Sequence, residues 1–137
     1  MIRQYTPEDL PAIMQIERAA FPKSTYPEEA FIGWNVSLPD CLLVYEGEKG
    51  AVQGYVMFWP EGHIASVAVL LPMQRRGIGS LLLKEVLGRC GAAWVEVRRG
   101  NAGARAFYEK HGFMEIDVLV GYYGNEDALV LVRPVEY

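Results

Sequence analysis

Residues 63–87 combine a buried strand, a short loop and a helix, and this order constrains the fold more than any other segment. Residues 64–71 are apolar except for Ser66, which is typical of a strand covered on both faces of a sheet, and Pro72 ends the run. Apolar residues return at helical spacing over 78–87. The chain therefore contains a strand followed directly by a helix, with a loop between them.

Two glycines, Gly77 and Gly79, occupy this loop and the start of the helix. Backbone N–H groups at a helix start lie at the positive end of the helix dipole, and glycine keeps side chains away from a bound phosphate. The segment therefore predicts a pyrophosphate site. An ordinary tight turn between a strand and a helix is the alternative interpretation of these glycines.

The glycine spacing separates the known phosphate loops. A nucleotide-triphosphate loop requires GxxxxGK[ST] and a Rossmann loop requires GxGxxG, and this segment matches neither pattern. Its spacing, Gln74-x-x-Gly77-x-Gly79, resembles the signature of the GNAT acetyltransferases, whose loop amides hold the pyrophosphate of acetyl-coenzyme A (acetyl-CoA). The resemblance implies cofactor contacts from the loop and the first helical turn, namely Gln74, Arg75, Arg76, Gly77, Ile78, Gly79 and Ser80.

Composition indicates one folded domain, expected to span residues 1–137. Hydrophobic residues make up 51% and charged residues 22%, which excludes a disordered chain. The net charge of −4 disfavours a nucleic-acid partner, although Arg75, Arg76, Arg98 and Arg99 are expected to form a local basic mouth. Both a monomer and a homodimer are compatible with the sequence.

Cysteine usage and the absence of targeting segments predict a cytoplasmic protein. Cys41 and Cys90 are isolated, with no metal-ligand spacing, so we expect two reduced core residues and no bound metal. Residues 1–10 lack the apolar core of a signal peptide, and no run of 18 uncharged apolar residues occurs. We therefore expect no membrane association.

The remaining segments alternate between strand and helix patterns. Helices are expected at 7–21, 27–36, 78–87 and 101–111, and strands at 2–5, 41–46, 51–59, 64–71, 92–97, 113–120 and 128–133. These elements predict an α/β (α+β) fold, with a single mixed central sheet of six to seven strands and about four helices on its two faces.

Three later segments extend the resemblance over nearly the whole chain. Residues 94–101 (WVEVRRGN), 106–113 (AFYEKHGF) and 122–128 (YYGNEDA) look like GNAT enzymes of the RimI type, which acetylate protein α-amino termini, including that of a ribosomal protein. Gly100 stands where these enzymes usually have serine, and Gly121 where a longer polar residue is usual. The likeness implies the GNAT fold, acetyl-CoA as cofactor and a peptide N-terminus as acceptor.

Acetyl transfer to an amine needs a base, a group that polarises the carbonyl and an acid for the leaving thiolate. An α-amino group has a pKa of about 7.7–8.0, so a modest base suffices, and Glu96 fits this role directly or through water. Tyr108 is a suitable acid, and the resemblance places the family's catalytic glutamate and general acid at these two positions. The alternative interpretation of Glu96 is a surface carboxylate, and that of Tyr108 is an aromatic residue of the core.

The resemblance also implies cofactor contacts outside the loop. The backbone amides of Val67, Ala68 and Val69, where the family splays two central strands apart, are expected to polarise the thioester carbonyl. Asn101 resembles the asparagine that steadies the pantetheine arm, and it equally suits a helix cap.

The acceptor site is less specific in sequence. Four aromatic residues are expected to line an entrance for the peptide terminus, and Glu28 or Glu29 is expected to attract its positive charge. The aromatic residues are Phe21, Tyr26, Tyr122 and Tyr123. Core packing and solvated helix acids explain the same residues. His63 begins the central strand and is an alternative base near the acceptor, or a residue that only borders a turn. His111 is expected to supply a favourable positive charge at the end of its helix.

The sequence thus predicts acetylation of a protein N-terminus, such as that of a ribosomal protein. A GNAT enzyme for a small amine, such as a polyamine, an aminoglycoside or an amino-acid-like metabolite, is the first alternative. A module that binds acyl-CoA without transferring the acyl group is the second.

Overall fold

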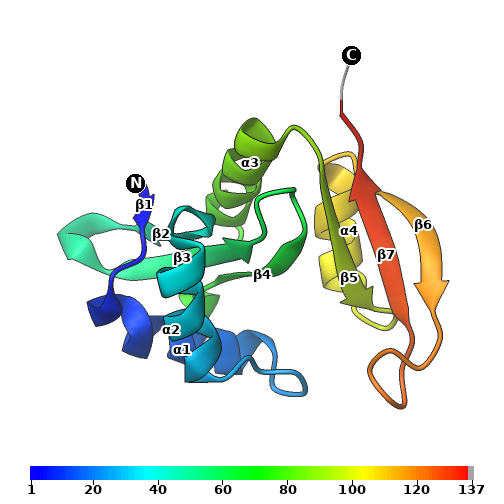
Figure 1. Ribbon diagram of the computed structural model, residues 1–137, viewed down its shortest axis with the longest axis horizontal. Helices are drawn as coiled ribbons and strands as arrows, with labels where there is room; N and C mark the ends of the chain where they lie inside the picture. The colour runs from blue at the N-terminus through cyan, green and yellow to red at the C-terminus, as the bar shows by residue number, and fades with distance from the viewer. Residues whose placement is uncertain (136–137) are drawn as a thin grey trace.

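The computed structural model describes residues 1–135, and Glu136 and Tyr137, at the end of the predicted domain span, lie outside the described residues. The strands are β1 (Ile2–Gln4), β2 (Leu42–Glu46), β3 (Val52–Phe58), β4 (Ile64–Val69), β5 (Ala93–Arg98), β6 (Met114–Leu119) and β7 (Ala128–Arg133) (Figure 1). The helices are α1 (Leu10–Ala20), α2 (Glu28–Ser37), α3 (Ile78–Cys90) and α4 (Ala102–Lys110).

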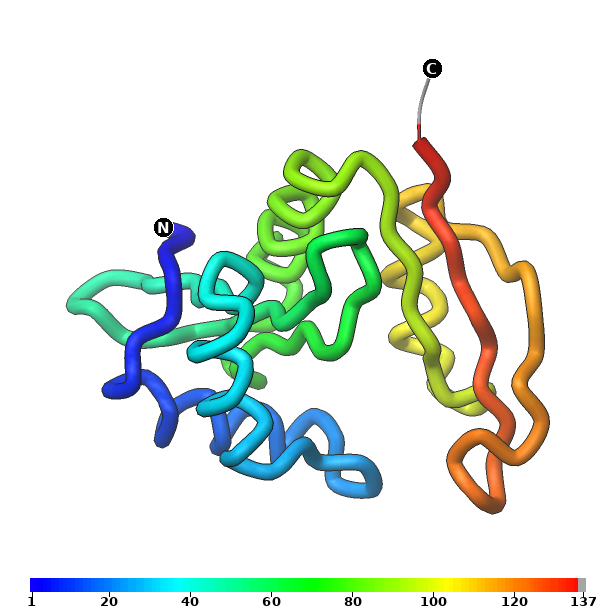
Figure 2. The backbone as a smooth tube through the Cα atoms, in the orientation of Figure 1, coloured from blue at the N-terminus to red at the C-terminus, as the bar shows by residue number. Residues whose placement is uncertain are grey.

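The strands form two hydrogen-bonded sheets, ordered β1-β2-β3-β4 and β5-β7-β6. Every strand pair within them is antiparallel. The two sheets are joined by an isolated parallel bridge between His63 and Trp94, after which β4 and β5 run apart (Figure 2). The predicted α/β fold class is confirmed, with the strands divided at the β4–β5 junction where one continuous sheet was expected.

Helices cover both faces of the four-stranded sheet. Side chains alternate between the faces, so Tyr55 and Met57 of β3 pack with α1 and α2, whereas Val56 and Phe58 pack with α3. The core around α3 continues into β5, α4 and β7, and so joins the two sheets through side chains. No helix within residues 1–135 has the length and apolar character needed to cross a membrane.

β4 is covered on both faces, as its apolar run predicted, because Ile64 packs in the core against α3 and Ala68 packs in the core against α1 and α2. Ile64, Ser66 and Ala68 are buried, but Ala65, Val67 and Val69 are partly exposed. Their partial exposure accompanies the separation of β4 and β5, because these residues line the cavity that opens there.

Candidate active site

Two cavities meet between the sheets. The larger, of about 900 Å³, is lined by β4, β5, α4 and the start of α3. The smaller, of about 300 Å³, lies between the α1–α2 connection, β4 and the β6–β7 connection. Residues that line both cavities mark where they join, and these are Phe21, Ser24, Ala65, Ser66, Glu96 and Tyr123. Glu96 is the carboxylate accessible from either side.

The loop before α3 presents backbone amides to the larger cavity. Gln74 folds back and donates from Nε2 to the carbonyl of Val69 at 3.2 Å, which holds the loop against β4. The first N–H groups of α3 have no helical partner and lie at the positive end of its dipole. The predicted loop residues line this cavity with the exception of Arg76, which lies outside it.

Glycine stands at the two loop positions for different structural reasons. Gly77 precedes α3 with φ +84°, a left-handed conformation that favours glycine, and a Cβ there would meet no atom within 4 Å. At Gly79 a Cβ would lie 3.3 Å from the ring of Phe107, so this glycine allows α4 to approach α3 closely. Gly79 therefore shapes the wall of the cavity as well as exposing its own amide.

β4 directs only alternate amides toward the larger cavity. The N–H of Leu70 donates to the carbonyl of Gln53 in β3. Because N–H groups alternate in direction along a strand, the N–H of Ala68 also points toward β3. The amides of Val67 and Val69 then point toward the gap between β4 and β5. Of the three predicted amides, that of Ala68 is therefore already engaged within the sheet.

Tyr108 and Asn101 come to the larger cavity from α4. Tyr108 lines the cavity and is otherwise buried, with its ring edge-on to Phe107 and Phe113 at centroid distances of 5.2 and 5.1 Å. Burial raises the pKa of Tyr108 well above its ordinary value, so its phenol stays protonated. Asn101 lines the cavity and also caps α4, because its Oδ1 accepts from the amide of Ala104 at 3.0 Å.

Glu96 and His63 form a close pair at the junction of the cavities. Nε2 of His63 lies 2.7 Å from Oε2 of Glu96, and their side chains are 24% and 18% exposed. The imidazole is stacked between Trp59 and Trp94, at centroid distances of 4.6 and 4.9 Å. The sequence singled out both Glu96 and His63 but did not predict their contact.

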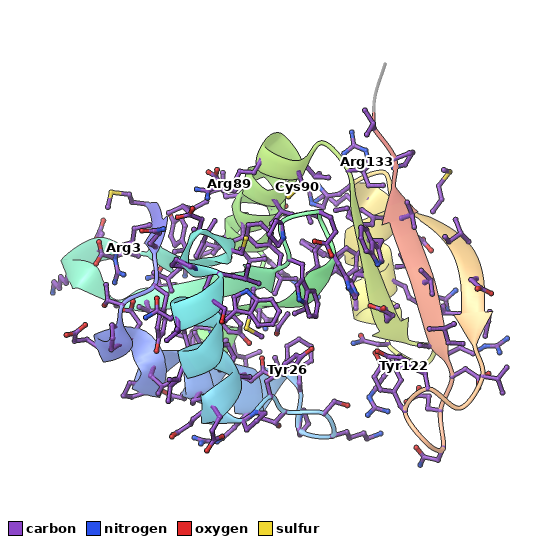
Figure 3. The ribbon with its side chains drawn as sticks, in the orientation of Figure 1. Arg3, Tyr26, Arg89, Cys90, Tyr122 and Arg133 are labelled. Atoms are coloured by element: carbon purple, nitrogen blue, oxygen red, sulfur yellow. The ribbon has the colours of Figure 1, made fainter. Side chains whose placement is uncertain are left out.

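The smaller cavity receives most of the residues predicted to bind the acceptor. Phe21, Tyr26, Tyr122 and Tyr123 line it, and Figure 3 shows Tyr26 and Tyr122 on its opposite sides. Burial, followed by the charges of neighbouring groups, raises the pKa of Tyr123 to about 12. Glu28 does not reach this cavity, because it lies at the surface 3.9 Å from Arg18.

Comparison with known proteins identifies the family. The model of the Acetyltransferase (GNAT) family matches residues 10–113. The chain belongs to the GNAT acetyltransferase family. It is thus an N-acetyltransferase that uses acetyl-CoA, as the resemblance predicted.

The alignments with individual relatives cover most of this GNAT chain and most of each relative. The ribosomal protein bS18-alanine N-acetyltransferase of Salmonella typhimurium is 33% identical, over 93% of this chain and 92% of the relative. The N-alpha-acetyltransferase of Sulfolobus acidocaldarius is 32% identical, over 98% and 92%. Among solved structures, Ard1 from Thermoplasma volcanium superposes with a TM-score of 0.89 at 26% identity, covering 100% of this chain and 98% of that one.

One acid of this acetyltransferase, Glu17, was missed in the sequence. It is fully buried in α1, where Oε1 accepts from the hydroxyls of Tyr55 and Ser66, and Oε2 accepts from the amide of Tyr26 at 3.0 Å. Glu17 also lines the smaller cavity. Its position on the apolar side of α1, four residues after Ile13, was the signal that could have identified it.

Arg98, one of the four arginines expected to form a basic mouth, ties the two walls of the smaller cavity together. Its guanidinium donates to Glu126 at 3.0 Å, donates to Ser24 and lies 4.1 Å over the ring of Tyr123. Arg99 is likewise paired, with Asp127 at 3.2 Å. These two arginines are therefore engaged with acids of their own chain.

The same interactions account for Gly100, where the family usually has serine. Its amide donates to Oε2 of Glu126 at 2.9 Å, and a Cβ at this position would lie only 2.8 Å from that oxygen. The glycine therefore leaves room for the Glu126 carboxylate beside its amide.

His111 does not supply the positive charge predicted for the end of α4. Burial, and then the charges of Lys110, Lys84 and Arg133, lower the pKa of His111. Its Nε2 instead lies 2.9 Å from Oγ of Ser80, linking α4 to the first turn of α3. The prediction is wrong because the sequence of α4 showed neither the burial of the His111 ring nor the approach of Lys84 and Arg133 from other elements.

Proposed function

We propose that this chain transfers the acetyl group of acetyl-CoA to the α-amino group of a protein N-terminus, such as that of a ribosomal protein. The observation that carries the proposal is the meeting of two cavities at Glu96, one large enough for a CoA thioester and one suited to a peptide terminus. The names of the relatives from Salmonella and Sulfolobus support the same acceptor class.

The residues around the larger cavity fit acetyl-CoA. The amides at the start of α3 are suited to the pyrophosphate, and the outward amides of Val67 and Val69 are suited to the pantetheine arm and the acetyl carbonyl. Asn101, at the far wall, is within the same cavity. When bound, acetyl-CoA supplies the activated thioester, and the protein supplies its position.

Each remaining task of the transfer has a residue in place. Glu96 accepts a proton from the acceptor amine at the junction of the cavities. The amides of Val67 and Val69 donate toward the carbonyl oxygen as negative charge develops on it. Tyr108, kept protonated by burial, donates its phenol proton to the leaving sulfur.

The smaller cavity suits a positively charged terminus. The described residues that line it include the acids Glu17 and Glu96 but no lysine or arginine. Tyr26, Tyr122 and Tyr123 supply aromatic walls with hydroxyl groups for a peptide backbone. A protonated α-amino group therefore enters a cavity whose charge attracts it.

The remaining parts of the proposal concern the protein as a whole. We propose one domain over residues 1–137, present as a monomer or homodimer, a question that light scattering answers directly. We also propose a cytoplasmic location, because Cys41 and Cys90 are both free thiols, as a reducing compartment maintains them.

The test is CoA release measured with a panel of acceptors. Peptides with free α-amino groups are expected to be acetylated, whereas the same peptides with blocked termini, polyamines and aminoglycosides are not. Turnover of the small amines alone would refute the proposed acceptor. Binding of acetyl-CoA without any turnover would refute the enzymatic role of Glu96 and Tyr108.

A further inference from the structure

We propose that His111 is a positioning residue of the cofactor site, which turns the hydroxyl of Ser80 toward the pyrophosphate of CoA and makes the affinity for CoA depend on pH. The inference rests on the proposed function for the placement of that pyrophosphate at the start of α3, and it does not depend on the acceptor. Ser80 contacts the cofactor, and His111 acts through Ser80.

Ser80 lies where the larger cavity meets the first turn of α3. The amide of Leu81 donates to the carbonyl of Gly77 at 3.0 Å and begins the helical hydrogen bonds, so the amide of Ser80 is the last one of α3 without a helical partner. Ser80 lines the cavity together with Gly77 and Gly79. Its amide and its hydroxyl are therefore two donors that one residue offers to the same phosphate.

His111 lies behind Ser80 and is not part of the cavity lining. Its Nε2 is 2.9 Å from Oγ of Ser80, and its ring is edge-on to Phe107 at a centroid distance of 5.1 Å. The backbone of His111 is fixed as well, since its amide donates to the carbonyl of Tyr108 at 3.0 Å and its carbonyl accepts from Arg133 at 3.3 Å. The imidazole therefore meets the hydroxyl in a defined geometry.

The protonation of the imidazole decides what the hydroxyl of Ser80 does. When Nε2 of His111 carries no proton, it accepts the hydroxyl proton of Ser80, and the hydroxyl then presents only lone pairs to a phosphate. When Nε2 carries a proton, it donates to Oγ, and the hydroxyl proton is free to point at a phosphate oxygen. A bound phosphate therefore favours a proton on Nε2, and it favours the imidazolium most, because the positive charge also attracts the anion.

The charges around His111 make the ring responsive to an anion. Burial, and then the charges of Lys110 on α4, Lys84 on α3 and Arg133 on β7, lower the pKa of His111 below its ordinary value of 6.5, so the ring is neutral at pH 7. Within residues 1–135, the charged groups that act on this ring are all cations. A phosphate at Ser80 offsets their repulsion and raises the pKa of His111. CoA should therefore bind more tightly as the pH falls below 6.5.

Calorimetry with dephospho-CoA measures this dependence in the full-length enzyme. Dephospho-CoA has the pyrophosphate but lacks the 3′-phosphate, a monoester that itself titrates near about pH 6. We expect the affinity of the native enzyme to rise by about 3- to 10-fold from about pH 7.5 to 5.5. His111→Gln is the matched control, because its amide keeps an N–H donor near the position of Nε2 but does not titrate. Its affinity should be nearly constant over the same range.

Ser80→Ala tests whether His111 acts through the hydroxyl. This substitution removes the hydroxyl and keeps the amide, so it should weaken binding by about 3- to 10-fold near pH 5.5 and remove most of the pH dependence. Combining it with His111→Gln should add little, because both residues act on the same hydrogen bond. A histidine that only links α4 to α3 would affect stability without this coupling.

Nitrogen NMR of the imidazole rings gives a readout that is independent of turnover. The chain has two histidines, His63 and His111, so the spectrum of His111→Gln assigns both. Saturation of the native enzyme with dephospho-CoA should raise the pKa of His111 and place a proton on its Nε2. Both effects should be smaller in Ser80→Ala, because the ring then has no hydroxyl to turn.

Three results would overturn the role of His111. These are equal pH dependence in the native enzyme and His111→Gln, full pH dependence in Ser80→Ala, or a His111 ring whose tautomer and pKa do not change when dephospho-CoA binds. If His111→Gln does not fold, His63→Gln assigns the spectrum and the NMR result alone decides. Failure of the native enzyme to bind CoA at any pH would instead refute the placement of the cofactor under the proposed function.

Discussion

Substitution of Gly62 by alanine tests whether the junction between the two sheets depends on a single backbone position. Gly62 has φ +106°, and its carbonyl accepts from Trp94 in the bridge that joins β4 to β5. A Cβ at this position would lie 2.2 Å from the carbonyl oxygen of Ala92, which is backbone and cannot rotate away. The substitution therefore forces the segment before β4 away from β5.

The expected cost has two parts. A non-glycine residue in the left-handed region loses about 1–2 kcal/mol, and relieving the overlap by moving backbone costs about 1–3 kcal/mol more. Alanine also restricts the unfolded chain, which returns about 0.4–1 kcal/mol. We therefore expect a net destabilisation of about 2–4 kcal/mol, or a fall in Tm of about 10 °C for a domain of this size.

Gly88→Ala is the matched control, because it makes the same chemical change at an unhindered helical position. Gly88 lies within α3, and a Cβ there would meet nothing within 4 Å, so alanine should stabilise the protein by about 0.5–1 kcal/mol. Urea unfolding of both variants measures the difference. If Gly62→Ala lies within about 0.5 kcal/mol of Gly88→Ala, the steric argument for the junction is wrong.

Three further substitutions test the site. Tyr108→Phe should lower kcat by about 10²- to 10⁴-fold with CoA affinity unchanged by calorimetry, and equal kcat values would remove Tyr108 as the acid. Glu17→Gln should raise the KM of the peptide and lower the free energy of unfolding by about 1–3 kcal/mol, because a glutamine amide cannot accept hydrogen bonds on both of its terminal atoms. Peptide kinetics measure the first effect and urea unfolding the second. The hydrogen bond from the amide of Gly100, and then the one from Arg98, hold the pKa of Glu126 below its ordinary value of 4.5. The interaction of Glu126 with Arg98 is therefore complete above pH 4.5, and it is lost as the pH falls through the lowered pKa of Glu126 in the folded protein. Glu126→Gln should therefore raise the peptide KM at neutral pH, and an unchanged KM would exclude a role for this tie in acceptor binding.

Local signals in the sequence predicted most of the elements. β7 has the predicted bounds, Ala128–Arg133, because an apolar run there is bounded by turn residues. Asn101 caps α4 as its residue type and position indicated, and Gly112 follows the end of that helix with φ +85°. The division into two sheets was not predicted, because alternating patterns define strands but not which of their edges are paired.

The site was predicted where its residues are adjacent in sequence and missed where they are not. The loop around Gly77 was visible as a motif, whereas His63 and Glu96 are 33 positions apart and meet only because the bridge aligns their strands. Glu28 was selected because it opens a helix near the predicted acceptor side, yet the acid at the cavity is Glu17, which the sequence analysis did not consider. A charged residue on an apolar helix face was the stronger signal. The roles assigned to these residues stay predictions until the variants are measured.

The alternation of β5 explains why one strand serves the acceptor side. Ala93, Val95 and Val97 face the core, so Trp94, Glu96 and Arg98 must share the opposite face. Trp94 stacks on His63, Glu96 bonds to it, and Arg98 ties the two connections together. A shift of one residue in the pairing of β5 with β7 would bury all three and expose the core residues. The register that stabilises the core therefore also positions the base, its histidine partner and the walls of the acceptor cavity.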